Sequence, residues 1–477
     1  MSFDRRISMD IAPLADWKYC SSEEKTVVVL VGLPARGKSY ISTKLSRYLN
    51  WVGINTRVFN VGAYRRRHMK TCNDHTYFSD DNNEGVAVRQ KIASEALDDL
   101  LSWLTSEVGE IAVFDATNTT RQRRLWIMER CKAHNLQVIF VESICKDKKL
   151  IQENVLEVKV NSPDYESMDK EEALRDFLKR IEHYEKRYES IDDDLDKDWS
   201  YIKIFDQGKR YLANRIEGNI NSRIVYYLMN IRVNKRTIYL TRHGETDLNL
   251  QGRIGGDGSL SERGKLYGQK LAVFMEQEKL QNLKVWTSYF KRTIQTADKI
   301  KCSQIRYWKA LDELDAGVCD GMTYDEIQEK YPDDFARRDA NKYHYRYPMG
   351  ESYHDLVTRL EPVIMELERQ TSVLVICHQA VARCLLAYFE DKDKVITRIP
   401  VANYPHPLYR LKLSVNFCQI TRNIQVDWLG KIDSQLITII CVFSGLDQSE
   451  LRDEIKLNSC FVIISGHSCI SHIVLLM

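Results

Sequence analysis

The segment Val27–Tyr40 constrains the fold of this chain more than any other stretch. It reads VVVLVGLPARGKSY, an apolar run too short for a typical helix, then the pattern G-x-x-x-x-G-K-S, and the helix-prone run Ile41–Leu49 follows. A strand, a glycine turn and a helix in this order form a phosphate-binding loop, because backbone N–H groups and the helix N-terminus face the phosphate oxygens. The sequence therefore predicts a parallel sheet with a nucleotide at the end of its first strand.

The residue types of this loop assign roles to its members. We expect Gly32 and Gly37 to let the backbone approach the phosphates, Lys38 to reach the β- and γ-phosphates, and the Ser39 hydroxyl to bind Mg²⁺. Asp115 ends the apolar run Ile111–Phe114, and a carboxylate at such a strand end can hold Mg²⁺ or its water. ATP and Mg²⁺ are the expected cofactors, with Lys38 and Asp115 catalytic and Ser39 and Asp115 as metal ligands.

Basic residues follow the predicted strands and helices of the first half. They include the cluster Gly62–Arg67 after the predicted strand Thr56–Val61, Arg89 in the predicted helix Glu84–Leu104, and Arg180 in the predicted helix Lys170–Tyr188. Any one of them is as readily explained by a solvated helix face. Several at the carboxyl ends of strands favour a bound phosphate. We expect Tyr201–Asp206 to be the last strand and residues 214–230 to form a helix.

A second strand pattern starts after Val233-Asn234-Lys235. Its first strand, Thr237–Leu240, leads into Arg242-His243-Gly244, and Arg292 and His378 follow two further predicted strands. A histidine beside arginines can attack a phosphoryl group while the guanidinium groups balance its charge. Glu313 is then a candidate proton donor to the leaving oxygen. Either histidine alone is as easily structural.

Composition excludes some partners. The formal net charge is +2, so bulk electrostatics favour neither nucleic acid nor an anionic membrane. No signal peptide and no run of about 18 apolar residues is recognised. The 12 cysteines form no C-x-x-C pairs and are expected to be reduced thiols. We expect a cytoplasmic protein that binds neither nucleic acid nor a membrane.

The first residues read as a flexible tail with one candidate modification site. Arg5-Arg6-Ile7-Ser8 places two guanidinium groups ahead of a hydroxyl, as basophilic protein kinases require. We predict that such a kinase phosphorylates Ser8, which adds about −1.5 to −2 charges beside Arg5 and Arg6. A solvated basic patch is the alternative.

Both halves together resemble one known family, over about Thr26–Asp391. The chain resembles the bifunctional 6-phosphofructo-2-kinase/fructose-2,6-bisphosphatases through the strings GLPARGKS, FDATNTT, SRIVYYLMNI, RHGETDLNLQGRIGGDGSLSERG, ELDAGVCDGMTYDEI and ICHQAVARCLLAYF. The family usually carries Thr where Ser39 stands; both residues supply a hydroxyl. The second half also resembles the wider histidine phosphatase superfamily.

The resemblance implies further site residues. In the first half it implies that the fructose 6-phosphate ligands are Arg65, Arg89, Thr117, Arg123, Lys159, Arg180 and Tyr184, and that Asn154 and Lys159 lie near the nucleotide. In the second half it implies that His243 is the nucleophile, that Glu313 and His378 handle protons and contact the phosphoryl group, and that the sugar bisphosphate is bound by Arg242, Asn249, Gly255, Arg292, Tyr324, Arg338, Lys342, Tyr353, Gln379 and Arg383.

The implied fold is α/β with two domains: a P-loop kinase with a mostly parallel doubly wound sheet, and a histidine-phosphatase domain similar to phosphoglycerate mutases. We expect a regulatory tail at residues 1–25, the kinase at 26–233, the phosphatase at 234–392 and a divergent segment at 393–477. The resemblance also implies a homodimer. The substrates it implies are ATP, fructose 6-phosphate and fructose 2,6-bisphosphate.

Three alternatives stay open. A kinase–phosphatase for nucleic-acid ends would show a basic stripe with aromatics, which the near-neutral charge disfavours. A non-catalytic sugar-phosphate sensor would not need Lys38, Asp115, His243 and Glu313. A kinase-dominant isoform with an impaired phosphatase would follow if residues 393–477 replaced a structural segment. In that segment we expect no catalytic motif, and Tyr409–Val415 as a substitute edge strand exposed to aggregation.

Overall fold

The structure is a computed structural model that describes most of the chain. The described residues are 25–69, 75–106, 108–156, 164–165, 168–232, 236–391 and 408–413, with the backbone of five further short strands between 417 and 463. The predicted modification site Ser8 and the predicted ligand Lys159 lie outside these residues.

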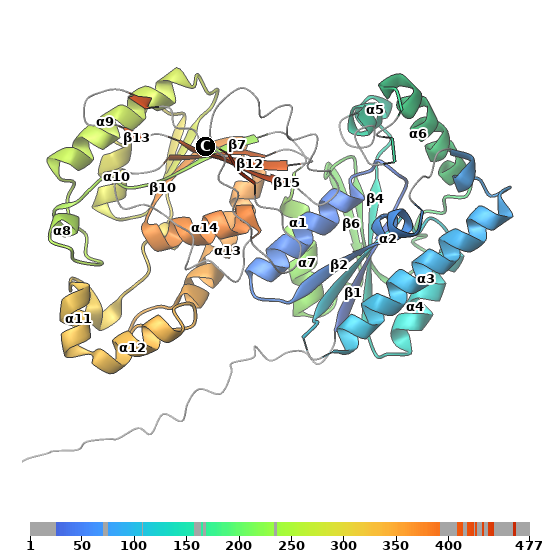
Figure 1. Ribbon diagram of the computed structural model, residues 1–477, viewed down its shortest axis with the longest axis horizontal. Coiled ribbons are helices and arrows are strands. Elements are labelled where there is room, and N and C mark those ends of the chain that lie inside the picture. Colours follow the sequence, from blue (N-terminus) through green and yellow to red (C-terminus); the bar gives the residue numbers. More distant parts are fainter. Residues whose placement is uncertain are drawn as a thin grey trace, which may run out of the picture.

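The first half of the chain forms one sheet with β1 at its centre (Figure 1). The described strands run in the order β2-β3-β1-β4-β5-β6 and are β1 (Thr26–Val31), β2 (Thr56–Asn60), β3 (Ile111–Asp115), β4 (Gln137–Ile144), β5 (Ser200–Phe205) and β6 (Arg210–Asn214). All pair in parallel except β6, which runs antiparallel to β5. The prediction of a mostly parallel sheet is confirmed.

Helices cover both faces of this sheet, which explains why β1 is buried at every position and apolar from Val27 to Val31. The helices are α1 (Lys38–Trp51), α2 (Val61–His68), α3 (Asn83–Thr105), α4 (Arg121–Lys132), α5 (Lys148–Asn154), α6 (Lys170–Glu185) and α7 (Asn219–Asn230), with the 3-10 turn η1 (His75–Phe78). Val28 and Leu30 pack with α1 and α7 on one face. Val27 and Val29 pack with α3 and α4 on the other.

Two local predictions for this half were wrong. Residues 201–206 do not hold the last strand, because the chain turns through positive φ at Asp206, Gln207 and Gly208 and returns as β6. The helix predicted from 214 therefore begins only at Asn219, after Gly218. The four residues 206–209 join Phe205 to Arg210, which pair antiparallel. Four-residue hairpin loops are common, and polar Asp and Gln gave a weaker signal for this turn than Asn-Gly would.

The second half forms a mixed sheet with β7 and β10 at its centre. The described strands run in the order β16-β15-β12-β11-β7-β10-β8-β9 and are β7 (Arg236–Arg242), β8 (Lys284–Thr287), β9 (Gln304–Tyr307), β10 (Ser372–Cys377), β11 (Leu408–Leu413), β12 (Phe417–Asn423), β15 (Ile437–Val442) and β16 (Phe461–Ile463). β13 (Gln425–Val426) and β14 (Ile432–Asp433) pair separately. The strands β7, β10, β8 and β9 are parallel.

Helices again cover both faces. They are α8 (Asp247–Leu250), α9 (Glu262–Gln277), α10 (Lys291–Ala297), α11 (Tyr324–Lys330), α12 (Pro332–Ala340), α13 (Tyr353–Arg369) and α14 (Gln379–Glu390), with the 3-10 turns η3 (Lys309–Leu311) and η4 (Gly317–Cys319). α13 and α14 contribute to one core and α9 to the core on the other face. Within the described helices of the chain, none is long and apolar enough to cross a membrane.

The C-terminal segment takes part in this sheet at β11. The predicted strand at 409–415 is present as Leu408–Leu413, but it is not an edge strand, because β7 pairs with it on one side and β12 on the other. Leu408, Tyr409 and Leu411 are buried, and Arg410 forms an ion pair with Glu278, the C-cap residue of α9. The expectation that this stretch exposes an unpaired apolar edge was therefore wrong.

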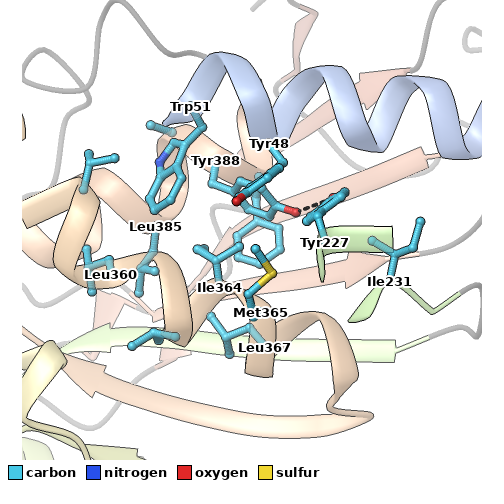
Figure 2. Packing of buried hydrophobic residues seen from close by; sticks show 14 of the residues in the cluster. Tyr48, Trp51, Tyr227, Ile231, Leu360, Ile364, Met365, Leu367, Leu385 and Tyr388 are labelled. Atoms are coloured by element: carbon cyan, nitrogen blue, oxygen red, sulfur yellow. Dashed lines mark hydrogen bonds between the residues drawn. The ribbon is translucent and has the colours of Figure 1, made fainter. Parts of the chain in front are cut away.

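One continuous core joins the two halves. α1 and α7 face α13 and α14 (Figure 1), and Figure 2 shows Tyr48 and Trp51 of α1 and Tyr227 of α7 meeting side chains of α13 and α14. Tyr48 and Tyr227 stack with their ring centroids 4.2 Å apart. The Tyr227 and Tyr388 hydroxyls lie 2.9 Å apart.

A buried ion cluster accompanies this shared core. Glu368 of α13 is fully buried and pairs with Lys44 of α1 at 3.0 Å and with Arg236 of β7. Burial alone would raise the pKa of Glu368, but Arg236 and Lys44 outweigh it and hold that pKa well below its usual range. Removing one partner would leave a charge buried without compensation, so this cluster fixes how the halves pack.

Candidate active sites

The phosphate-binding loop lies between the end of β1 and the start of α1. Gly32 and Gly37 have φ values of 133° and 80°, which side chains rarely tolerate. A Cβ at Gly32 would lie 2.6 Å from the Ser143 carbonyl oxygen, so only glycine fits there. Lys38 Nζ donates to the Leu33 carbonyl oxygen at 2.6 Å, which places the ammonium group over the loop. The structure thus has the strand, the turn and the helix N-terminus that the sequence predicted for an anion site.

Asp115 lies beside this loop because β3 is hydrogen-bonded to β1. Its carboxylate accepts hydrogen bonds from Ser42 Oγ at 3.3 Å and from the Asn60 side chain. Ser39 is exposed at the start of α1. A hydroxyl and a carboxylate are hard oxygen donors of the kind that Mg²⁺ accepts together with substrate phosphates, so these residues fit the expected ion. In the described part of the chain, no three His, Cys, Asp or Glu side chains form a metal site by themselves.

The predicted sugar-phosphate ligands gather around Asp164 and η1. Arg65 of α2 forms an ion pair with Asp164, and Arg180 of α6 lies 3.6 Å from the same carboxylate. The Arg180 guanidinium carbon is 3.6 Å from the centre of the Phe78 ring. Burial would raise the pKa of Asp164, but Arg65 and Arg180 outweigh it and lower the pKa. The structure therefore brings Arg65 and Arg180 together.

The remaining predicted ligands of this half contact η1, α3 or the phosphate-binding loop. Arg89 of α3 donates to the Tyr77 carbonyl oxygen in η1, and Tyr184 lies with its ring centroid 6.0 Å from that of Phe78. Arg123 of α4 bonds Gln90 of α3, and burial lowers its pKa to about 10. The Thr117 carbonyl oxygen accepts from Gly32 N at 2.9 Å, and Asn154 Nδ2 donates to the Ala35 carbonyl oxygen at 3.4 Å. Thr117 and Asn154 thus contact the loop itself.

In the second half, three predicted residues meet at the ends of adjacent strands. His243 follows β7, His378 follows β10, and Arg292 lies in α10 after β8. Arg292 Nε lies 3.2 Å from His243 Nε2 and 3.2 Å from His378 Nδ1. The ring centroids of the two histidines are 5.1 Å apart, and all three side chains are buried.

The hydrogen-bond partners of His243 determine which ring nitrogen carries its hydrogen. Its Nδ1 lies 2.7 Å from the Gly244 carbonyl oxygen, which only accepts, so Nδ1 carries the hydrogen and donates it. Nε2 therefore carries the lone pair that can attack an electrophile. His378 has a pKa well below its usual range because it is fully buried and faces Arg292, His243 and Arg242.

Glu313 lies against the N-terminus of α14, next to His378. Its carboxylate accepts from Gln379 N at 2.9 Å, from Ala380 N at 3.2 Å and from Leu314 N at 3.0 Å. These backbone groups fix the predicted proton donor beside the histidine pair. Arg359 of α13 donates to the carbonyl oxygens of Ala310 and Asp312 and so holds the loop that carries Glu313.

Two pairs of predicted bisphosphate ligands contact each other. Arg338 of α12 donates to the Tyr324 hydroxyl at 3.3 Å, and Arg383 of α14 donates to the Tyr353 hydroxyl at 3.0 Å. Burial, and then Arg338 and Arg383, lower the pKa of Lys342 to about 8. Lys342 therefore lies close to both arginines.

The other predicted ligands lie along the same chain segments. Arg242 ends β7 and precedes His243, and Gln379 opens α14. Asn249 of α8 caps its helix through the Thr246 backbone. Gly255 has φ of 70°, and a Cβ there would overlap the Asp320 carboxylate at 1.6 Å, so its role is to bring the loop close to Asp320.

Sequence reasoning missed the residues that hold these ligands. Asn60 bonds Asp115, Asp164 pairs with two arginines, and Ser288 lies 2.8 Å from His378. None of them belongs to a motif with its own chemistry. The position of Ser288, directly after the strand that precedes Arg292, was the one available signal.

Comparisons with known proteins agree with this division of the chain. A family model described as 6-phosphofructo-2-kinase matches residues 16–235. One described as histidine phosphatase superfamily (branch 1) matches residues 238–414. The second match continues beyond Asp391, where the resemblance was expected to end, and includes β11.

Curated relatives match most of the chain. A 6-phosphofructo-2-kinase/fructose-2,6-bisphosphatase from Gallus gallus is 56% identical over 396 residues, which cover 83% of this chain and 84% of the relative. The Homo sapiens 6-phosphofructo-2-kinase/fructose-2,6-bisphosphatase 1 is 56% identical and is covered to 83%, as is this chain. Among solved structures, an alpha-ribazole phosphatase from Shigella flexneri is 20% identical and aligns with 36% of this chain and 89% of its own, with a TM-score of 0.33. The chain belongs to the 6-phosphofructo-2-kinase/fructose-2,6-bisphosphatase family.

Proposed function

We propose that this chain is a bifunctional enzyme that makes fructose 2,6-bisphosphate from ATP and fructose 6-phosphate and hydrolyses it back to fructose 6-phosphate. The observation that carries the proposal is the presence, in one chain of this family, of a phosphate-binding loop and of a buried His–Arg–His cluster. The two reactions together set the level of a sugar bisphosphate that regulates glycolysis. The near-neutral composition and the sugar-phosphate arginines leave a nucleic-acid end-processing enzyme without support.

In the kinase reaction, the sugar 2-hydroxyl oxygen bonds to the γ-phosphorus of ATP and releases its proton to solvent, and the bond from that phosphorus to the β–γ bridging oxygen breaks and leaves ADP. Catalysis here depends on position and charge. Lys38 neutralises the phosphates, and Arg65 and Arg180 bind the 6-phosphate of the sugar. When bound at Ser39 and Asp115, Mg²⁺ would supply further neutralisation of the phosphoryl oxygens.

In the phosphatase reaction, His243 Nε2 bonds to the 2-phosphorus and the bond from phosphorus to the sugar oxygen breaks. Glu313 gives a proton to the leaving oxygen, while Arg242 and Arg292 balance the phosphoryl charge. Water then attacks the phosphorus of phospho-His243 and gives one proton back to Glu313, while the N–P bond breaks and the imidazole is restored. The kinase-dominant alternative has little support, because β11 packs within the phosphatase sheet beside the strand that leads to His243.

A paired assay on purified full-length protein tests the proposal. ATP-dependent synthesis from fructose 6-phosphate and release of phosphate from the 2-position are measured on the same preparation. We expect both activities, with synthesis dependent on Mg²⁺. Activity on a nucleic-acid end, or neither reaction, would contradict the proposal.

Three further assignments go beyond these reactions. We propose that the protein is a cytoplasmic homodimer and that a basophilic kinase modifies Ser8, as the family resemblance and the Arg-Arg-Ile-Ser string suggest. Sedimentation tests the dimer, and imaging of a tagged chain tests the location. Full phosphorylation of Ser8 is expected to change the kinase-to-phosphatase ratio. An unchanged ratio, also after deletion of residues 1–22, would end that idea.

A further inference from the structure

Ser288 lies behind the histidine pair, on the side away from His243. It is the first residue after β8 and is fully buried. Its Oγ lies 2.8 Å from His378 Nε2, 2.9 Å from Thr293 Oγ1 and 3.1 Å from Phe290 N. Ser288 therefore contacts the nitrogen of His378 that does not contact Arg292.

Some partners of Ser288 and Thr293 can only accept a hydrogen bond and others can only donate one. These partners determine where each hydroxyl hydrogen lies. Thr293 Oγ1 lies 2.9 Å from the Phe290 carbonyl oxygen, which only accepts, so the threonine donates there and can accept from Ser288. Phe290 N only donates, so Ser288 Oγ accepts from it. Ser288 thus gives its hydrogen to Thr293 and keeps one lone pair for His378.

The other side of the ring leads to the same assignment. A guanidinium Nε–H only donates, so His378 Nδ1, at 3.2 Å from Arg292 Nε, must be an acceptor. A neutral imidazole with an acceptor at Nδ1 carries its hydrogen on Nε2. That hydrogen points to the lone pair of Ser288 Oγ. The contacts at Nδ1 and at Nε2 therefore indicate the same tautomer of His378.

We propose that Ser288 is a positioning residue for the phosphatase reaction, because its hydroxyl holds the Nε2–H tautomer of His378 and so turns the Nδ1 lone pair toward the reacting phosphoryl group. The inference rests on the proposed phosphatase function. His378 Nδ1 and His243 Nε2 both accept from the same N–H of Arg292, so the two lone pairs converge on one place. A proton added to His378 can go only to Nδ1, where it would face a phosphoryl oxygen.

The groups around His378 make its neutral form sensitive to this hydroxyl. Arg292 of α10 faces it, as do Arg242 and His243 at the end of β7 and Arg359 of α13. The Glu313 carboxylate binds the adjacent backbone of α14. Burial and the cationic neighbours favour neutral imidazole, which has two tautomers, and Ser288 selects between them. Without the hydroxyl, the buried Nε2–H would lose its acceptor.

The test uses full-length protein with Ser288→Ala, Ser288→Thr and a matched control, Thr287→Val. Thr287 is equally buried and ends β8 directly before Ser288. Its hydroxyl donates to the Ser288 carbonyl oxygen at 2.9 Å rather than to either histidine. Synthesis of fructose 2,6-bisphosphate by the same chains reports correct folding. Single-turnover formation of phospho-His243 is measured with substrate labelled at the 2-phosphate, and ¹⁵N spectra of labelled histidine report the tautomer of His378.

We expect Ser288→Ala to slow phosphoenzyme formation about tenfold while KM changes less than about threefold. The spectrum should shift from the Nε2–H form to a mixture, and Ser288→Thr should restore both. An unchanged rate or tautomer in Ser288→Ala would overturn the inference, as would an equal loss in Thr287→Val or a loss in Ser288→Thr with synthesis intact. If the parent forms no phosphoenzyme, the proposed function fails instead.

Discussion

In the first domain Arg65 and Arg180 share the carboxylate of Asp164, whereas in the second Arg292 donates to two histidine nitrogens and to the Gly256 carbonyl oxygen. The same difference holds for Arg89 and Arg383, although Arg338 of the second domain pairs with Asp339 at 2.9 Å. Arg89 lies 3.7 Å from Asp80 in the first domain, while Arg383 bonds a tyrosine hydroxyl in the second.

The two domains differ in the partners that a bound phosphate must displace from the arginines. At the proposed kinase site a sugar phosphate would compete with a carboxylate for the guanidinium groups, so binding would exchange one anion for another. At the phosphatase site Arg292 offers its charge through bonds to neutral partners, which a phosphoryl group can replace without separating an ion pair. The second arrangement has the preorganised positive field that stabilises a transition state.

The largest expected effect separates chemistry from binding at the phosphatase site. His243→Ala removes the nucleophile but leaves the arginines, so acid-labile, base-stable labelling from the 2-phosphate should disappear while bound substrate is retained. Equilibrium dialysis should give a dissociation constant within about threefold of the parent. Persistent label would place the nucleophile elsewhere, and lost binding would contradict a site preorganised by its arginines.

Lys38→Met should lower the kinase activity and leave the phosphatase activity unchanged. The ammonium group that neutralises the β- and γ-phosphates is lost, so synthesis should fall by about 100-fold or more. Hydrolysis should remain, because the two sites lie in separate domains. The two rates are measured on one preparation. Synthesis at the parental rate would remove Lys38 from the mechanism.

Asp164→Asn should give Arg65 and Arg180 a neutral partner, as Arg292 has at the phosphatase site. The variant removes the anion that holds Arg65 and Arg180, so KM for fructose 6-phosphate should fall by about tenfold. This change corresponds to roughly 1.4 kcal/mol of binding free energy. Initial rates at saturating ATP give this KM. A higher KM would mean that Asp164 positions the arginines more than it competes with the substrate.

The smallest effect is a pH dependence at the phosphatase site. Burial, and then Arg338 and Arg383, lower the pKa of Lys342 to about 8, so its positive charge is present below that pH and is lost as pH rises through it. Hydrolytic kcat/KM, which reports the free enzyme, should therefore fall by about fivefold above pH 8. Lys342→Arg keeps the charge and should extend the plateau. Identical profiles would exclude Lys342 from binding.

The sequence predicted which of the proposed reactive groups lie together, because each of them stands in a linear pattern. Lys38 and Asp115 follow apolar strands that pair in the sheet, and Arg242-His243-Gly244 and His378 end two neighbouring strands. Parallel pairing brings such ends to one edge, so position along the chain sufficed to place them together.

The residues that hold these groups in place could not be predicted from a linear pattern. Asp164 and Ser288 act through contacts with residues 99 and 90 positions away in the chain, and such contacts arise only from packing. The β5–β6 turn was missed because its residues carry weak turn signals. The strand at β11 was predicted from its composition, but its central place depends on β12, which no local pattern specifies.

The core shared by α1, α7, α13 and α14 bears on how the two activities can be inherited or engineered. If the gene were divided between the domains, each product would present the faces of Tyr48, Tyr227 and Tyr388 to solvent, and Glu368 would lose the ammonium group of Lys44. Fission would therefore require new surface residues on both fragments. Loss of one activity is more readily reached by substitution within its own site, with the unused domain retained as a structural partner.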